Sequence, residues 1–253
     1  MINKQEQEII KNWKGDIANP LVSICCITYN HEDYISDALD SFLMQETDFP
    51  FEICLGEDDS SDKTRKICLQ YAKKYPNIIK LLLRKREDVI YINSLPTGRF
   101  NIIETLKECQ GEFIALCEGD DYFLDRNKLE QQVNEMNKYP SIKMSFHKAK
   151  VINSDERGIS NVIGSDKNNI HIFTQKEIII NDGSFCPTSS LMFRKEVFKD
   201  LTKVFCKVTA FDYFIQIIGS ANNAIFLPYV FSVYRVHDSS LTAEFRRNSL
   251  TFF

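Results

Sequence analysis

The sequence predicts an α/β protein with a mostly parallel central sheet flanked by helices, and three observations carry this prediction. Apolar runs alternate with segments of helical spacing through the first half of the chain. An acidic turn, Glu118 to Asp121, directly follows the apolar run 113–117. A second acidic segment, 57–62, follows the apolar run 51–55. Parallel sheets bind ligands at the carboxyl ends of their strands, so both acidic segments lie where a binding site is expected.

Strands and helices are expected to alternate through the first half of the chain. The strands are expected at 21–28, 51–55, 78–83 and 113–117. The helices are expected at 32–44, 61–75 and 100–109, after a short polar helix at 3–14. Ser61 is a suitable N-cap for the helix that it opens. The basic segment 84–99 contains Pro96 and Gly98 and is expected to be irregular. The alternation favours right-handed crossovers between parallel strands.

The second half of the chain is less regular. Helices are expected at 128–139, at a short segment that the Thr174/Glu177 capping box opens, and at 210–218. Strands are expected at 142–152, 189–193, 224–227 and 229–236, the last two separated by Pro228. The polar segment 153–169 is expected to be a loop, and the residues after Leu241 predict nothing. No Gly/Ser linker separates the halves, so one folded unit is expected.

The composition is that of a globular protein: 43% of the residues are hydrophobic and 26% are charged. The net charge of −4 gives no reason to expect a nucleic-acid partner. None of the eight cysteines forms a C-x-x-C pair, and most lie beside apolar runs. They are expected to be small buried hydrophobic residues in a reducing compartment. The polar first twenty residues and the lack of a bilayer-length apolar run predict a cytoplasmic location.

The acidic turn Glu118-Gly119-Asp120-Asp121 is the first candidate for chemistry. Unpaired carboxylates do not stay charged in a core, so these side chains lie at a surface or hold a cation. Oxygen ligands of this kind suit Mg²⁺ or Mn²⁺ bound together with substrate phosphates. The alternative is a solvated acidic turn at the end of a strand.

Two further clusters follow the first and second strands. Thr28, Tyr29 and Asn30 can stack on a base and hydrogen-bond to it, or they can simply close a strand. In the segment 57–62, Glu57 and Asp58 can accept hydrogen bonds from a base N–H or from ribose hydroxyls. The alternative is a helix N-terminus whose acidic residues interact favourably with the helix dipole.

Four stretches together resemble the inverting, metal-dependent glycosyltransferases of family 2, which have the GT-A fold. The stretches are 22–30, 52–64, 111–122 and 128–132. The resemblance covers about residues 20–240. It implies a single GT-A domain over 1–253, with a nucleotide-sugar-binding half at about 20–125 and a smaller acceptor-binding half at about 126–240.

The resemblance also implies roles for particular residues. Nucleotide contacts are expected from Thr28, Tyr29, Asn30, Glu57, Asp58, Asn101, Glu118 and Gly119. Metal contacts are expected from Asp120, Asp121 and His237, and a contact with the donor diphosphate from Arg235. Asp212, at the start of a helix, is the expected catalytic base, and Thr188 and Ser189 are expected to face the acceptor. The alternatives are that Asp212 serves only the helix dipole and that His237 is structural.

The activity that the resemblance implies is transfer of a sugar from a nucleotide-sugar donor to a glycan or lipid-linked acceptor. A UDP-sugar donor, Mn²⁺ or Mg²⁺ as cofactor and a role in surface polysaccharide synthesis are expected. Peripheral association with the inner face of the membrane fits such an acceptor. One alternative is a catalytically inactive nucleotide- or glycan-binding module. Another is a nucleotidyltransferase, although Tyr29-Asn30-His31-Glu32 is not the Gly-rich, basic phosphate loop that such enzymes need.

Overall fold

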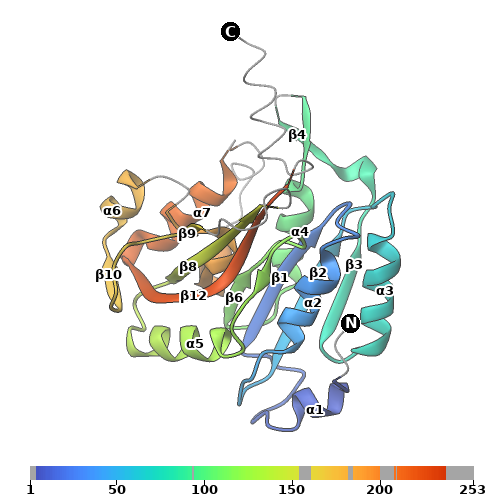
Figure 1. The fold of residues 1–253 in the computed structure, drawn as a ribbon, viewed down its shortest axis with the longest axis horizontal. Helices are drawn as coiled ribbons and strands as arrows, with labels where there is room; N and C mark the ends of the chain where they lie inside the picture. Colours follow the sequence, from blue (N-terminus) through green and yellow to red (C-terminus); the bar gives the residue numbers. More distant parts are fainter. Residues whose placement is uncertain are drawn as a thin grey trace.

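A computed structural model describes residues 4–92, 94–153, 161–181, 185–199, 208 and 210–237. Within these residues, ten strands form one sheet, in which the order along the main path is β10-β12-β8-β11-β6-β1-β2-β3. Helices cover both faces of the sheet (Figure 1). The α/β class predicted from the alternating pattern is confirmed.

The first half of the chain builds the parallel part of the sheet. Its four strands are β1 (Val22–Thr28), β2 (Phe51–Glu57), β3 (Ile79–Leu83) and β6 (Phe113–Leu116). They pair in parallel in the order β6-β1-β2-β3. The crossover helices are α2 (Ile35–Leu43), α3 (Thr64–Lys74) and α4 (Arg99–Glu108). Because β1 and β6 are covered on both faces, they are continuous apolar runs rather than alternating ones.

The second half extends the sheet with mixed pairing. β11 (Met192–Arg194) lies antiparallel between β6 and β8 (Met144–Asn153). β8 runs parallel to β12 (Ala224–Val236). The remaining strands pair antiparallel at the edges: β7 (Tyr122–Phe123) and β10 (His171–Phe173) with β12, and β9 (Asn161–Ile163) with β8. One sheet therefore joins the segments on either side of residue 125.

Two predictions about strands in the second half were wrong. The strands expected on either side of Pro228 are one strand, β12, whose register shifts between Leu227 and Val230. A bulge accommodates a proline because the ladder hydrogen bond is already interrupted there. The strand expected at 189–193 begins only at Met192, because residues 188–190 form a 3₁₀ turn that is closed by a hydrogen bond from the Ser190 N–H to the Pro187 carbonyl.

The structure also corrects several other boundaries. The described part of the segment 84–99 contains a 3₁₀ turn, η1 (Arg86–Asp88), and two strands that pair antiparallel, β4 (Ile90–Ile92) and β5 (Leu95–Thr97). Ser61 is not the cap of α3; the Asp62 carboxylate accepts the N–H of Thr64 instead, at 2.9 Å. The first helix, α1, is limited to Glu6–Ile10, and β9 interrupts the expected loop at 153–169. The tail after residue 241 lies outside the described residues.

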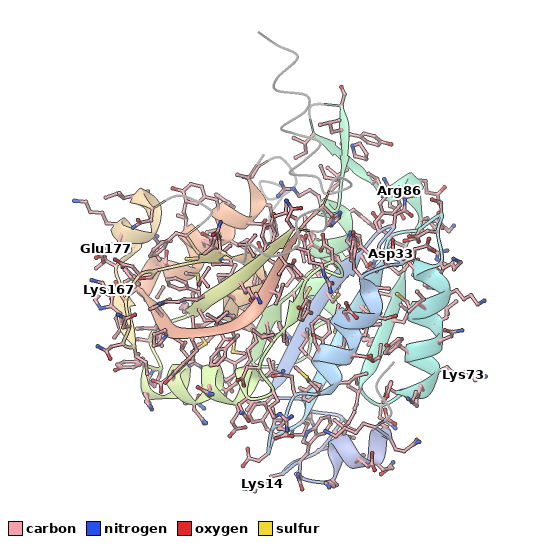
Figure 2. The ribbon with its side chains drawn as sticks, viewed as in Figure 1. Lys14, Asp33, Lys73, Arg86, Lys167 and Glu177 are labelled. Atoms are coloured by element: carbon pink, nitrogen blue, oxygen red, sulfur yellow. The ribbon has the colours of Figure 1, made fainter. Side chains whose placement is uncertain are left out.

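Two apolar layers hold the helices to the sheet. One layer packs α1, α2, α3 and α5 (Lys128–Lys138) against one face. The other packs α4, α6 (Gln175–Ile180) and α7 (Phe211–Gly219) against the opposite face. Charged side chains such as Lys14, Lys73 and Lys167 point outward at the periphery (Figure 2). The described cysteines are all free and buried, as expected: Cys25, Cys26, Cys54, Cys68, Cys109, Cys117 and Cys186.

Candidate active site

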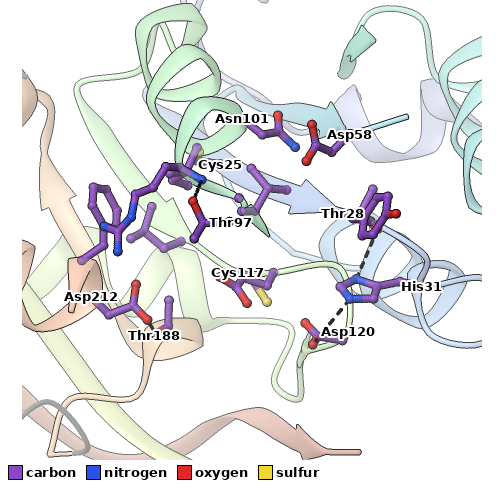
Figure 3. Close-up of a pocket in the computed structure, with 18 of the residues that line it drawn as sticks. Cys25, Thr28, His31, Asp58, Thr97, Asn101, Cys117, Asp120, Thr188 and Asp212 are labelled. Atoms are coloured by element: carbon purple, nitrogen blue, oxygen red, sulfur yellow. Dashed lines mark hydrogen bonds and ion pairs between the residues drawn. The ribbon is translucent and has the colours of Figure 1, made fainter. Parts of the chain in front are cut away.

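A cavity of about 550 Å³ opens at the carboxyl ends of the parallel strands. The ends of β1, β2 and β6 meet at this edge of the sheet, as their parallel pairing requires. The cavity walls include four carboxylates from three separate places in the sequence: Asp58, Glu118 with Asp120, and Asp212. Figure 3 shows Asp58 and Asn101 along one wall, with Asp120 and Asp212 facing each other from opposite sides. The two acidic strand ends therefore contribute to one site.

At one end of the cavity a carboxylate lies between two imidazoles: Asp120 and His31 line the cavity, and His237 contacts Asp120 from outside the lining. The Oδ2 atom of Asp120 lies 3.1 Å from Nε2 of His237 and 3.7 Å from Nε2 of His31. One ligand atom from each of these three residues lies within 4.8 Å of the other two. The second oxygen of Asp120, Oδ1, is buried without a hydrogen-bond partner. An orphaned carboxylate oxygen beside two imidazole nitrogens fits a divalent cation such as Mn²⁺.

His31 was not among the residues predicted from the sequence. It follows β1 by three residues, in a turn that the left-handed backbone of Asn30 (φ 52°) allows. The N–H of His31 donates to the Thr64 hydroxyl at 2.8 Å, and its Nδ1 lies 3.3 Å from the Thr28 hydroxyl. These contacts aim Nε2 of the ring at Asp120 (Figure 3). The signal available in the sequence was a histidine just past a strand whose end meets the acidic turn.

Gly119 lets this turn approach β1. A Cβ at Gly119 would lie 2.7 Å from the Thr28 hydroxyl oxygen and 2.8 Å from its Cβ. No larger side chain fits there unless β1 moves. The expected nucleotide contact of Gly119 therefore stays a prediction, while its small size has a direct packing reason.

The carboxylates of the acidic turn differ in their electrostatics. Burial opposes ionisation of Asp120, but the hydrogen bond with His237 and the nearby His31 outweigh it, so the pKa of Asp120 lies below its ordinary value. Restricted solvation and repulsion from Asp120 and Asp212 raise the pKa of Glu118 well above its ordinary value. Burial and the charge of Asp120 likewise raise the pKa of Asp121. A bound cation would relieve this mutual repulsion.

Arg235 and Asp121 have partners other than those expected. The guanidinium of Arg235 pairs with Asp37 at 2.5 Å and donates to the backbone carbonyl of Asp120 at 2.9 Å. The backbone N–H of Arg235 donates to Oδ1 of Asp121 at 2.8 Å. The structure thus brings Asp121 to Arg235, and the group of His31, Asp120 and His237 does not include it. Metal ligation by Asp121 and diphosphate binding by Arg235 stay predictions.

The wall formed by β2 carries the groups expected to contact a base. Asp58 is 3% exposed, and its Oδ2 accepts from Arg86 at 2.7 Å, while Oδ1 is buried without a hydrogen-bond partner. Burial raises the pKa of Asp58 to about 6 despite the opposing effect of Arg86. Tyr29 is half-exposed, and the Arg86 guanidinium carbon lies 4.1 Å from its ring centroid. An aromatic face next to an unfilled carboxylate acceptor suits a planar ligand that carries an N–H group.

Three residues predicted to contact the nucleotide have protein partners instead. Glu57 lies outside the cavity lining, fully buried, and accepts from Arg65 and from the Ser60 N–H. The side chain of Asn30 accepts the Ser61 N–H at 2.9 Å, also outside the lining. Asn101 lines the cavity, but its amide donates to the Gly56 carbonyl at 2.9 Å. Their nucleotide contacts stay predictions, and in the structure these side chains bond to β2 and to the turn that follows it, on either side of Asp58.

The opposite side of the cavity carries Asp212 in the first turn of α7. Its carboxylate accepts a hydrogen bond from the Thr188 hydroxyl at 3.3 Å (Figure 3). Restricted solvation raises the pKa of Asp212, although Arg99 and Thr188 act in the opposite direction. Ser189, by contrast, is fully buried and bonds to Ser232 at 3.0 Å, so it does not line the cavity. Of the two residues expected to face an acceptor, the structure places only Thr188 beside the candidate base.

Comparison with known proteins supplies the family. The profile described as Glycosyl transferase family 2 matches residues 23–202. The chain belongs to glycosyl transferase family 2. An uncharacterized relative in Mycobacterium tuberculosis, Rv1520, is 30% identical over 221 residues, which are 85% of this chain and 59% of the relative. The Escherichia coli enzyme WfgD, named a UDP-Glc:alpha-D-GlcNAc-diphosphoundecaprenol beta-1,3-glucosyltransferase, is 28% identical over 226 residues, 88% of this chain and 80% of WfgD.

Two solved glycosyltransferase structures share the fold of this chain. Staphylococcus aureus TarS in complex with UDP-GlcNAc superposes with a TM-score of 0.63 at 22% identity, covering 87% of this chain and 59% of TarS. The mannosyltransferase PcManGT from Pyrobaculum calidifontis, in complex with GDP-Man and Mn²⁺, gives 0.62 at 17% identity, covering 94% and 63%. The GT-A fold prediction is confirmed. The chain spans about 59% of the length of Rv1520. In the part of this chain that the structure describes, no helix has both the length and the apolarity to cross a membrane.

Proposed function

We propose that this family member is an inverting glycosyltransferase that transfers a sugar from a nucleotide-sugar donor to a hydroxyl of a glycan or lipid-linked acceptor. The observation that carries the proposal is one cavity lined by His31 and Asp120 at one side, where His237 contacts Asp120 from outside the lining, and by Asp212 at the other. His31, Asp120 and His237 suit a cation that binds the donor diphosphate. Asp212 is placed to act as a base toward the acceptor. A pocket that only binds a nucleotide needs no base of this kind.

His31, Asp120 and His237 would hold Mn²⁺ or Mg²⁺ in this proposal. A divalent cation there supplies Lewis-acid stabilisation of the charge that develops on the departing nucleotide diphosphate. Imidazole ligands favour Mn²⁺ over Mg²⁺, which prefers oxygen alone. The solved structure of PcManGT with GDP-Man and Mn²⁺ supports the choice of Mn²⁺ for this fold.

Asp212 would take the proton from the acceptor hydroxyl as that oxygen attacks the sugar. Its raised pKa brings it closer to the operating pH, where a general base is most effective. Thr188 donates a hydrogen bond to Asp212 and so fixes the direction of the carboxylate. The acceptor hydroxyl would enter on the side of the cavity that faces away from His31, as inversion at the sugar carbon requires.

Asp58 and Tyr29 support a donor whose base presents a ring N–H, such as uracil or guanine. The free oxygen of Asp58 can accept an N–H from uracil or guanine, whereas cytosine presents a lone pair at the equivalent position. WfgD is named for a UDP-Glc donor, and TarS was solved with UDP-GlcNAc, so a UDP-sugar is the donor proposed here. The name of WfgD also supports a lipid-linked acceptor and a role in surface polysaccharide synthesis. Peripheral membrane association stays a prediction.

Thermal-shift measurements with UDP, GDP, dTDP and CMP, each with and without Mn²⁺, test the proposal. A ligand that binds only the folded chain raises the melting temperature. UDP with Mn²⁺ is expected to give the largest shift, CMP the smallest, and Asp120→Asn is expected to remove the part that depends on Mn²⁺. Incubation with UDP-sugars then tests for release of UDP. Binding of UDP without any turnover would instead support an inactive nucleotide-binding module, and no shift with any nucleotide would contradict the proposal.

A further inference from the structure

Near the end of β12, the Arg235 side chain makes several contacts with the rest of the site. Its guanidinium lies over two tyrosine rings, with its carbon 5.2 Å from the Tyr34 centroid and 4.6 Å from the Tyr122 centroid. It pairs with Asp37 on α2 at 2.5 Å and donates to the Asp120 carbonyl at 2.9 Å. Only 12% of the Arg235 side chain is exposed. A planar guanidinium suits such a stacked, multiply bonded position better than a lysine would.

These contacts converge on the candidate metal ligands. Arg235 bonds to the backbone of Asp120, and its own N–H bonds to the Asp121 carboxylate at 2.8 Å. His237 follows Arg235 by two residues, and its ring lies 4.7 Å from that of Tyr34, which Arg235 also contacts. The position of Arg235 therefore fixes both sides of the 3.1 Å contact between His237 and Asp120.

Asp37 supplies the charge that holds Arg235 in this place. It lies in the first turn of α2, 198 residues before Arg235, and its side chain is 60% exposed. Because the Asp37 side chain is mostly exposed to water, its own contribution to global stability is small. Loss of Asp37 should therefore leave the fold intact while freeing the guanidinium to move.

We propose that Asp37 and Arg235 form a latch that positions His237 and Asp120 for cation binding. This inference rests on the metal site of the proposed function. Asp37 and Arg235 are positioning residues here, since neither needs to touch the cation or the donor. Loss of either residue is expected to lower the affinity for the cation. The position of Asp58, on the cavity wall formed by β2, should not change.

The test is a calorimetric titration with Mn²⁺ alone, which measures the Mn²⁺ affinity of the wild-type chain and of the variants Asp37→Ala and Asp37→Glu. Asp37→Ala should bind Mn²⁺ about tenfold more weakly, the low end of the effect of residues that orient metal ligands. Asp37→Glu, which keeps the charge, should recover most of the affinity. The matched control is Glu46→Ala, which removes an exposed pair with Arg126 at 3.0 Å that is absent from the cavity lining. It should bind Mn²⁺ like the wild type.

Three results would overturn the latch. The first is wild-type Mn²⁺ affinity in Asp37→Ala. The second is a loss in Asp37→Ala that Asp37→Glu does not recover. The third is a loss accompanied by a fall in melting temperature in the absence of metal that Glu46→Ala does not show, because the effect would then be general destabilisation. A wild-type protein that binds no Mn²⁺ overturns the proposed metal site as well, so the two failures are distinguishable.

Discussion

Asp58 should make recognition of the base depend on pH. Its carboxylate is buried, and burial raises its pKa to about 6. The ionised form is the better acceptor for the N3–H of uracil, so binding should favour ionised Asp58. Affinity for the base should therefore be high above pH 6 and fall as the pH drops below it.

The expected size of the effect follows from the fraction of ionised Asp58. With a pKa of about 6, roughly nine-tenths of the groups are ionised at pH 7 and roughly one-tenth at pH 5. If only the ionised form binds, affinity should fall about tenfold between these two values, or about 1.4 kcal/mol. Asp58→Asn retains an acceptor oxygen but does not titrate, so its affinity should be lower at pH 7 and flat with pH.

The assay is a titration with uridine in the absence of metal, in which NMR measures the affinity for uridine. Uridine has no phosphate that titrates in this range, and omitting the cation removes competition between protons and Mn²⁺ at the histidines. The reasoning is refuted if the affinity of the wild type for uridine is the same at pH 7 and pH 5. It is equally refuted if Asp58→Asn shows the same decline, because another group would then be responsible.

Three further predictions concern other parts of the molecule. His31→Gln should lower Mn²⁺ affinity about 10- to 100-fold by calorimetry and leave uridine affinity unchanged; unchanged Mn²⁺ affinity would exclude His31 as a ligand. Asp212→Asn should retain donor affinity while the transfer rate falls about 10²- to 10⁴-fold in a product assay, and a wild-type rate would reject it as the base. Lys128→Met should raise the free energy of unfolding at pH 7, measured in urea, by about 2 kcal/mol. The substitution removes the cost of burying the lysine, and this gain is partly offset because the Gln132 oxygen loses its hydrogen-bond donor. Burial lowers the pKa of Lys128 from 10.5 to about 7, so this gain should be largest below pH 7 and shrink as the pH rises toward 10.5; a less stable variant at pH 7 would contradict it.

The positions of the strand ends could be predicted from the sequence because they depend on local pattern. Apolar runs that stop at polar residues located Asp58, Asp120 and the end of β1. The alternation of side chains along a strand also carried information that the prediction did not use. Adjacent residues such as Glu57 and Asp58 point to opposite sides, so only one of them can face the cavity. Burial of Glu57 against Arg65 agrees with that rule.

The remaining features of the site depend on distant contacts. The orientation of the His31 ring depends on the left-handed backbone of Asn30 and on a hydrogen bond to Thr64, 33 residues away. The partner of Arg235 is Asp37, on a helix near the other end of the chain. No periodicity or spacing reports such pairs, which form only when segments distant in the sequence come together in the folded chain. The phosphate contact of Arg235, which the family resemblance implies, stays a prediction.

The most direct test measures UDP affinity with and without Mn²⁺ in the wild type and in Asp120→Asn. Asp120 is the group between the two histidines, and the substitution removes its charge with almost no change in shape. Mn²⁺ should strengthen UDP binding to the wild type and have little effect on Asp120→Asn, whose affinity for UDP without metal should be similar to that of the wild type. An equal gain from Mn²⁺ in both proteins would contradict a cation held by His31, Asp120 and His237.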